Sequence, residues 1–479
     1  MNRSRLSRSK PGFPWPLLLL AVGLGWAGGC ATQPVAPAPL SAESGAAEFA
    51  ARSLSDAGLH RFLADNLGRD PGGAWDFETL SWVAFYYHPS LGLARAQWAT
   101  ARATQQTVTA RPNPTISLTP GYSTNPDAGV SPWFPAVNFD FLLPNSGKRA
   151  HQADIARADA EAARLAVLTA AWQVRSDLRR ALVDAGSAAR RESLLREQAA
   201  VQLRLLTLAE QRLAAGAAAS SEVAAMRSAS FKSEAAALDA HSQAALARAR
   251  VAAAAGLPLA ALEGVALPVP AAAPALSAEA FAAARQTSLQ TRADVLAALA
   301  HYASAQAALE LEVAKQQPDI HLGPGYQWDQ GQNKWSVALT FELPIFHRNE
   351  GPIAEMTSRR AEAAAQFTAA QAQAIAAIDA ATLAQSAAAV QLGHARRQQE
   401  IAGQQNARAA ARLAAGESEQ SEVQNARLAV AEAGLAVADA ESAAALAAGE
   451  LEDALQIPFA NLAALTPAPA APATSPRSP

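Results

Sequence analysis

The chain contains Arg212-Leu-Ala-Ala-Gly216 followed by Ser221-Glu222-Val223, and later Arg412-Leu-Ala-Ala-Gly416 followed by Ser421-Glu422-Val423. The two copies lie 200 residues apart without a gap. Three further pairs recur in the same order at a separation of 200 or 204 residues: Leu143-Pro144 with Leu343-Pro344, Leu257-Pro258 with Ile457-Pro458, and Pro120-Gly121-Tyr122 with Pro324-Gly325-Tyr326. These matches indicate a duplication in which each half is one structural unit. We expect the units over residues 75–258 and 291–458, joined by a linker or equatorial segment over residues 259–290.

Alanine-rich segments without proline predict long helices in both halves. They cover about Ala150 to Leu213 and about Ile353 to Leu413, and at 1.5 Å per residue each rod is about 100 Å long. Gly216 and Gly416 then stand where a helix ends and the chain turns, so a second helix returns from each turn. Shorter helices are expected before the strands, over Leu91–Ala110 and Val295–Lys315. On the first rod, a packing seam is expected along Val167, Val174, Leu178, Ala181 and Ala185.

Between the short and long helices, each half carries a period of two that predicts strands. The alternating apolar residues are Val137, Phe139 and Phe141 in the first half and Trp335, Val337, Leu339, Phe341 and Leu343 in the second. Each half therefore encodes two strands of roughly 8 to 12 residues, the length of a tilted membrane strand. They lie within about Thr115–Leu143 and Asp319–Leu343. Trp133, Trp328 and Trp335 fit either an aromatic belt at the membrane surface or ordinary core packing.

Four strands cannot close a membrane barrel, because the smallest barrels use about eight. An open sheet would leave its edges unpaired in lipid. Other copies of the chain must therefore complete the barrel, and the long helices would then surround a common axis as a tube.

Composition excludes several classes of function. The chain has 479 residues, with 39 Lys and Arg against 42 Asp and Glu, so it is not a broadly basic nucleic-acid binder. A single cysteine excludes disulfides within one subunit and paired-cysteine metal or redox sites. No interior run of 18 apolar residues occurs, and we expect no membrane-spanning helix in the mature chain. The eight histidines are scattered and no hydrolase, metalloprotease or nucleotide-binding motif is present, so we predict no enzyme activity, no cofactor and no metal site.

The N-terminus reads as an export signal over residues 1–29. Basic residues precede a short apolar run and small residues, and the only cysteine, Cys30, follows at once. The segment resembles a bacterial lipoprotein signal, which implies a lipid on Cys30. Ala31 stands where an aspartate would imply retention at the inner membrane, so the resemblance implies the outer membrane. Ordinary cleavage beside an incidental cysteine is the alternative. We assign residues 30–74 to a lipidated tether and residues 459–479, rich in proline and alanine, to a disordered tail.

From about Trp75 to Pro458, these features resemble the TolC-like outer-membrane efflux proteins. The resemblance rests on the paired turns, the proline-initiated hairpins and the closing Leu-Pro or Ile-Pro. It implies a mainly α-helical homotrimer in which each chain gives four strands to a 12-stranded barrel and long helices to a periplasmic tunnel. It further implies an exit duct in the outer membrane of a Gram-negative bacterium. The partners would be a periplasmic adaptor (membrane fusion) protein and an inner-membrane resistance-nodulation-division pump.

Two corner motifs suggest a branch within this family. Leu343-Pro-Ile-Phe-His-Arg-Asn-Glu-Gly351 and Leu143-Pro-Asn-Ser-Gly-Lys-Arg149 look like the branch that serves cobalt-zinc-cadmium pumps, which implies divalent heavy-metal cations as cargo. A multidrug duct is one alternative. A periplasmic helical adaptor without a pore is another, although such adaptors usually carry one helical hairpin and a lipoyl-like domain.

The two turns are the candidate functional residues. The resemblance implies that the periplasmic adaptor docks on them, through Arg212, Gly216, Ser221, Arg412, Gly416 and Ser421. Acidic residues near the turns would form rings around a threefold pore, where they favour cations: these are Glu222, Glu417, Glu419 and Glu422. The alternative is that these carboxylates only stabilise the N-terminal ends of helices.

Overall fold

The computed structural model describes residues 37–69, 72–73, 75–144, 147–270 and 277–458. Cys30, the export signal and the predicted tail lie outside these ranges. The chain divides into two units, residues 1–51 and 52–479, and each is described by itself. In the described part of the first unit, helix α2 (Ala42–Ala50) begins at Ser41, whose hydroxyl accepts a hydrogen bond from the Ser44 amide.

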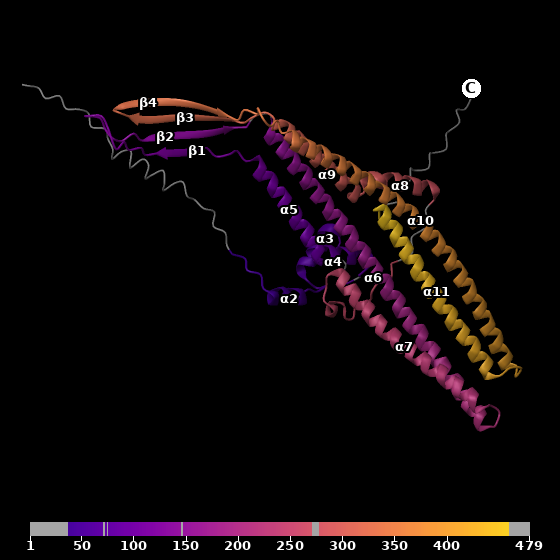
Figure 1. Ribbon diagram of the computed structural model, residues 1–479. Coiled ribbons are helices and arrows are strands. Elements are labelled where there is room, and N and C mark those ends of the chain that lie inside the picture. The colour runs from indigo at the N-terminus through magenta and orange to yellow at the C-terminus, as the bar shows by residue number, and fades with distance from the viewer. Residues whose placement is uncertain (1–36, 70–71, 74, 145–146, 271–276, 459–479) are drawn as a thin grey trace, which may run out of the picture. The chain divides into compact units, whose positions relative to one another are not determined.

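The second unit confirms the duplication element by element (Figure 1). The first repeat contains α5 (Pro89–Thr109), β1 (Thr115–Thr119), β2 (Ala136–Leu143), α6 (Lys148–Ala214) and α7 (Ser220–Ala255). The second repeat contains α9 (Ala293–Ala314), β3 (Ile320–Asp329), β4 (Gln332–Phe341), α10 (Glu350–Ala414) and α11 (Gln420–Leu455). Both long helices and both turns therefore lie where the sequence predicts them.

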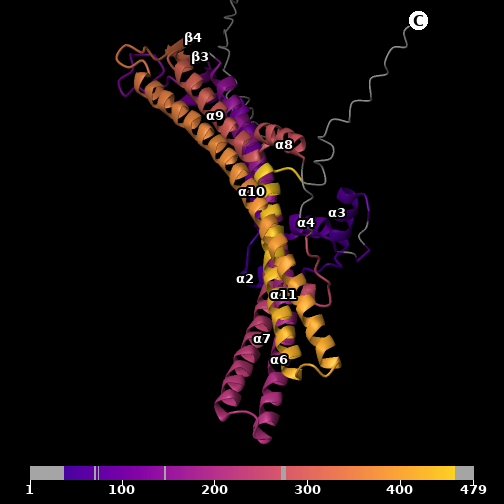
Figure 2. The same cartoon turned by 90° about the vertical axis from the view of Figure 1, so that its right-hand side faces the viewer.

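The long helices pack side by side through small residues (Figures 1 and 2). Helix α6 contacts α5, α7, α9 and α11, while α10 contacts α9 and α11. The buried positions of α10 recur every seven residues over most of its length: Ala374, Ala381, Ala388, Ala395, Ala402 and Ala409. A seven-residue repeat keeps one seam against a neighbouring helix, and alanine lets the two backbones approach closely. The predicted seam of α6 is confirmed, with Val174, Leu178, Ala181 and Ala185 buried and Val167 partly buried.

The N-terminal part of this unit differs from the predicted tether. Helices α3 (Ala57–Leu67) and α4 (Phe77–Tyr87) pack into the main core, with Leu59 and Leu63 fully buried. Residues 57–67 therefore belong to the folded unit, because leucines four positions apart share one helix face that meets α4. The predicted segment 259–290 contains a short 3₁₀ turn, η1 (Leu259–Leu262), and most of α8 (Ala278–Thr291).

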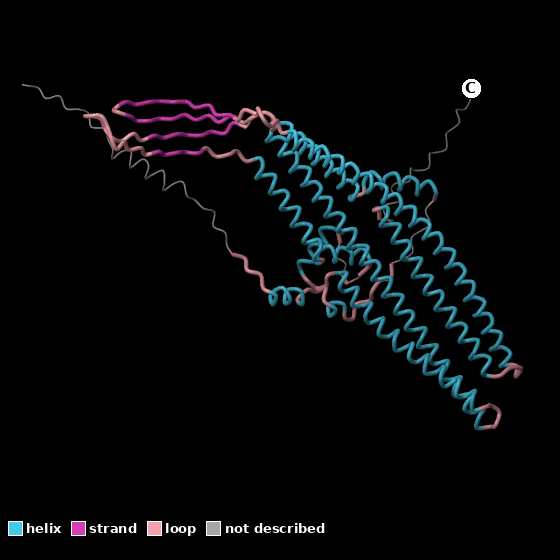
Figure 3. Tube along the Cα trace, in the orientation of Figure 1, coloured by secondary structure: helices cyan, strands magenta, loops and turns pink. Residues whose placement is uncertain are grey.

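The four strands form one antiparallel sheet in the order β1-β2-β3-β4 (Figure 3). Strands β2, β3 and β4 have 8, 10 and 10 residues, but β1 has only 5, shorter than predicted. The reason lies in Pro120, which has no N–H to donate to the ladder. Beyond it, only the isolated bridge between Tyr122 and Trp133 continues the hairpin. Strand β3 begins at Ile320, one residue after Asp319.

One described helix, α10, is long and apolar enough to cross a membrane when only length and composition are counted. Its sequence has no unbroken run of 18 apolar residues, because glutamines are scattered among the alanines of this helix. Only 17% of the apolar 18-residue window of α10 is buried within the chain.

Candidate functional site

The sheet has one apolar and one polar face. Register places Ile116 opposite Phe139, Phe141 opposite Leu322, and Tyr326 opposite Trp335. Because side chains alternate along a strand, the apolar face carries Ile116, Leu118, Val137, Phe139, Phe141, Leu143, Ile320, Leu322, Pro324, Tyr326, Trp335, Val337, Leu339 and Phe341. The other face is mainly polar and carries Thr115, Ser117, Asn138, Asp140, His321, Gln327, Lys334, Ser336 and Thr340, with Leu142 and the small residues Ala136 and Ala338 among them. This division is typical of a sheet with lipid on one side and water on the other.

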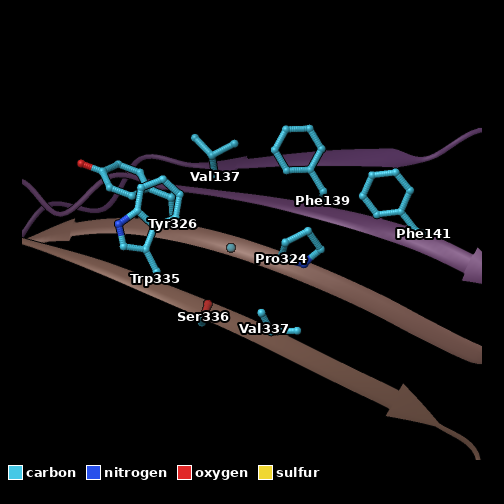
Figure 4. Close-up of a pocket in the computed structure, with 9 residues that line it drawn as sticks. Val137, Phe139, Phe141, Pro324, Tyr326, Trp335, Ser336 and Val337 are labelled. Atoms are coloured by element: carbon cyan, nitrogen blue, oxygen red, sulfur yellow. The ribbon is translucent and has the colours of Figure 1, made fainter.

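The apolar face is exposed, and its middle is hollowed. Figure 4 shows the hollow, lined by Val137, Phe139, Phe141, Pro324, Tyr326, Trp335 and Val337. Trp335 is 80% exposed and its ring lies 4.8 Å from that of Tyr326, whose hydroxyl donates to Asn333 near the β3–β4 turn. Trp335 therefore stands outside the core, which favours the aromatic-belt interpretation for this residue. So many exposed aromatic and aliphatic side chains on one face call for a covering partner or solvent other than water.

The sheet and the helices both end in open edges. Within the described residues, β1 pairs only with β2 and β4 pairs only with β3. Exposed apolar side chains also follow one face of α7, at Phe231, Leu238 and Leu246, and one face of α10, at Leu383, Val390 and Ile401. These α7 and α10 stripes repeat at whole numbers of helical turns. Both helices belong to the edges of the helical layer, so a single chain is incomplete on two sides.

Hydrogen bonds fix the corners between strands and long helices. In the first repeat, Arg149 at the start of α6 donates to the Thr109 carbonyl at the end of α5, over 2.8 Å. In the second, the Asn349 side chain before α10 donates to the Glu312 carbonyl over 2.7 Å and also to its carboxylate. Partial burial acts to raise the pKa of Glu312, but hydrogen bonds from Lys315 and Asn349 outweigh it and hold that pKa below its usual value. Both corner motifs therefore join the start of a long helix to the end of the short helix before it.

The two turns have the same backbone geometry. Gly216 and Gly416 have φ of +69° and +76°, in the left-handed region that favours glycine. In each turn the amide of the residue after the glycine donates to the arginine carbonyl five positions earlier, Ala217 to Arg212 and Glu417 to Arg412. These bonds satisfy carbonyls that a helix end leaves free. The structure thus confirms where the chain turns, while the docking role of the turns stays a prediction.

Arginines of the same chain face most of the predicted aperture acids. Arg412 lies 2.7 Å from Glu422 and Arg212 lies 3.5 Å from Glu222. Arg212 also lies 4.0 Å from Glu419 of the other repeat. Glu222 and Glu422 stand in the first turns of α7 and α11, where a carboxylate is favourable. Glu417 is exposed in the turn itself. The carboxylates are thus partly balanced within one chain.

Sequence reasoning missed a buried ion cluster where α6 meets α11. Arg175 and Arg179 both donate to Glu452, and Ser176 donates to Asp453. The cluster is nearly closed to water, with Glu452 only 2% exposed at its side chain. Burial raises the pKa of Asp453 and lowers that of Arg179. The sequence did carry a signal: Gly449 in alanine-rich α11, where a Cβ would lie 2.4 Å from Cδ of Arg179. The next residue, Arg180, is exposed beside Asp177.

A sheet with a lipid-type face, open edges and long helical hairpins defines the class of outer-membrane channel subunits. The family model described as outer membrane efflux protein matches residues 85–257 and 284–455, and the chain belongs to this family. The two matched segments coincide with the two repeats. No curated protein matches the chain.

Solved structures share the fold. The outer membrane protein VceC of Vibrio cholerae has a TM-score of 0.66 and 21% identity, over 80% of this chain and 96% of that one. The CmeC outer membrane channel of Campylobacter jejuni has a TM-score of 0.66 and 15% identity, over 88% and 93% of the two chains. The MtrE outer membrane channel of Neisseria gonorrhoeae, in an open state, has a TM-score of 0.63 and 17% identity, over 80% and 89%. The described residues contain no group of three or more His, Cys, Asp or Glu arranged to hold a metal ion.

Proposed function

We propose that the chain is the exit duct of a tripartite efflux system, a homotrimer whose β-barrel crosses the outer membrane and whose helices form a periplasmic tunnel. The observation that carries this proposal is the two-faced sheet with two open edges. Three copies give twelve strands, and each β4 edge then pairs with the β1 edge of a neighbour, so that no backbone group is left unpaired in lipid. The exposed stripes on α7 and α10 support the same closure along the helices.

The decisive experiment places a lysine on either face of the sheet. Leu339→Lys puts a charge on the apolar face, and Thr340→Lys, its neighbour on β4, puts the same charge on the polar face. A lysine facing lipid at mid-bilayer costs about 2–4 kcal/mol, so Leu339→Lys should reduce the trimer in outer-membrane fractions strongly. Thr340→Lys should leave it unchanged and alter ion conductance. Equal effects of the two substitutions would contradict a barrel built from this sheet.

We further propose that the cargo is divalent heavy-metal cations, passed on by a resistance-nodulation-division pump through a periplasmic adaptor. The resemblance of the two corner motifs supports the metal branch. The described residues of the corners form hydrogen bonds between helix ends and include no group of three or more His, Cys, Asp or Glu arranged to hold a metal ion. A strain that lacks the chain should become sensitive to zinc, cobalt or cadmium. Sensitivity to organic dyes alone would favour the multidrug alternative.

The membrane anchor is proposed on the sequence alone. Cys30 follows the apolar and small residues of the export signal, and its lipid would hold the mature N-terminus in the outer membrane. Mass spectrometry of the mature chain should find an acylated Cys30 as its first residue, and Cys30→Ala should change processing without abolishing the trimer. An unmodified Cys30 inside a longer mature chain would support ordinary cleavage.

A further inference from the structure

The corner after β4 exposes three large apolar side chains within four residues. Phe346 is 101% exposed, Ile345 68% and Leu343 64%. The segment is nevertheless held in place. The Ile345 amide donates to the Leu343 carbonyl over 2.8 Å, and the Gln316 side chain donates to the Arg348 carbonyl over 3.0 Å. Together with the bond from Asn349 to Glu312, these contacts fix the segment on the end of α9, so its side chains project from a structured corner.

This corner continues the apolar face of the sheet. Val337, Leu339 and Phe341 alternate along β4 on that face, and Leu343 follows at the next position of the same period. Ile345 and Phe346 then extend the apolar surface past the last paired residue, at the end of the sheet that joins the helices (Figure 3). His347 and Arg348 come next. An apolar segment that ends in polar and cationic side chains is typical of a chain crossing from acyl chains to headgroups.

The first repeat shows that a corner of this kind does not require the apolar pair. The positions 200 residues before Ile345 and Phe346 are Asn145 and Ser146, and they also follow a Leu-Pro pair. Both corners lead from a strand into a long helix that starts within five residues of these positions. The turn itself therefore does not require Ile345 and Phe346. We explain these two exposed apolar side chains by what surrounds the second corner.

We propose that Ile345 and Phe346 bind lipid, inserting among the acyl chains of the periplasmic leaflet of the outer membrane just below its headgroups. The inference rests on the proposed function, because it takes the apolar face of the sheet as the lipid face. Lipid is the occupant that fits, because the segment is continuous with that face and Arg348 beside it suits a lipid phosphate. A trimer would carry three such apolar corners, alternating with three polar ones.

Spin labelling of the full-length trimer tests this in vesicles of phosphatidylethanolamine and phosphatidylglycerol. A nitroxide is attached at Phe346→Cys in a Cys30→Ala background, since Cys30 is the only native cysteine. Leu339→Cys on the apolar face is the lipid reference, and Ala217→Cys in the first turn is the water reference. Oxygen concentrates in the bilayer and a nickel chelate stays in water, so the ratio of their collision rates reports the surroundings of each label. At position 346 we expect a ratio close to that of position 339 and several-fold above that of position 217.

Each outcome decides a different point. A water-like ratio at position 346 with a lipid-like ratio at position 339 would overturn the inference and leave the barrel intact. A label at position 346 that neither reagent reaches would also overturn it, because a neighbouring subunit would then cover the corner. A water-like ratio at position 339 would instead remove the proposed barrel.

A second variant copies the first corner into the second. Ile345→Asn with Phe346→Ser should still form trimers in detergent. Burying one such side chain is worth about 1.5–3 kcal/mol. The insertion of the double variant into vesicles should therefore fall by about tenfold or more. Unchanged insertion would contradict the lipid contact.

Discussion

The buried cluster between α6 and α11 can be tested by Glu452→Gln. Glutamine keeps the volume of the side chain but removes the charge that Arg175 and Arg179 share. The exposed fractions of the two arginine side chains are 17% and 8%, so both cations would stay buried with no full counter-charge. Breaking a buried pair in this way costs about 3–5 kcal/mol. We expect the lower end, about 3 kcal/mol, because the amide oxygen of glutamine can still accept one hydrogen bond.

The matched control is Glu441→Gln, which removes a similar contact between neighbouring helices on the surface. Arg396 lies 3.1 Å from Glu441, and both side chains are about half exposed. An exposed pair contributes about 0–1 kcal/mol, so this variant should behave like the wild type. Both substitutions remove one carboxylate, and the difference between them isolates the effect of burial.

Hydrogen exchange on the purified protein measures the effect where it arises. A loss of about 3 kcal/mol raises the open population about 100-fold, so the amides of α6 and α11 around the cluster should exchange about 100 times faster in Glu452→Gln. Replacing Arg175, Arg179 and Glu452 together by methionine, methionine and leucine should restore most of the protection, because the two cations and their shared counter-charge are removed together. The reasoning is refuted if Glu452→Gln and Glu441→Gln exchange alike, or if the triple variant is less protected than Glu452→Gln.

Three further outcomes are expected. Gly216→Ile and Gly416→Ile force a β-branched residue to a φ near +70°, at a cost of about 1–2 kcal/mol each. These variants should abolish efflux and adaptor capture, while gel filtration still shows the trimer. Retained efflux would contradict the docking role of the turns. Glu417→Gln with Glu419→Gln should raise basal conductance or weaken block by divalent cations in planar bilayers, and unchanged values would leave these residues as helix-end charges only. Asp453→Asn should stabilise the protein at pH 7, because burial raises the folded-state pKa of Asp453 and ionising it opposes folding. That gain should shrink as the pH falls and the wild-type carboxyl becomes neutral, so melting temperatures that differ equally at pH 7 and pH 4.5 would contradict this assignment.

Local patterns predicted the parts of the fold that depend on neighbouring residues. The packing seam of α6, the glycines at positions 216 and 416 and the alternation along β4 each depend on residues close together in the sequence, and the structure agrees with them. The predicted length of β1 was wrong because a single residue, Pro120, has no N–H and ends the hydrogen bonding between β1 and β2. The sequence analysis placed α3 in the tether because its two buried leucines indicate a core helix only when their packing against α4 is known.

Contacts between residues far apart in the chain could not be predicted from the sequence. Arg175 and Glu452 are 277 positions apart, and Gly449 in the sequence of α11 does not show which residue approaches it. The contact between Arg212 and Glu419 has the same character, since it joins the turns of the two repeats. Such pairs depend on how the hairpins lie against each other, which no periodicity within one helix encodes.

The two repeats are alike where the backbone constrains them and differ where side chains are free. Both turns need glycine at φ near +70°, and both corners need a donor that reaches the end of the preceding short helix, supplied by Arg149 in one repeat and Asn349 in the other. At exposed positions the backbone does not require a particular residue type. The turn of the second repeat has Glu417 and Glu419 where the first has alanines, and its corner has Ile345 and Phe346 where the first has asparagine and serine. Around a threefold axis, acidic tips and apolar corners would therefore alternate with neutral ones. If the chain forms the proposed trimeric duct, its contacts with cations at one end and with lipid at the other should belong mainly to the second repeat.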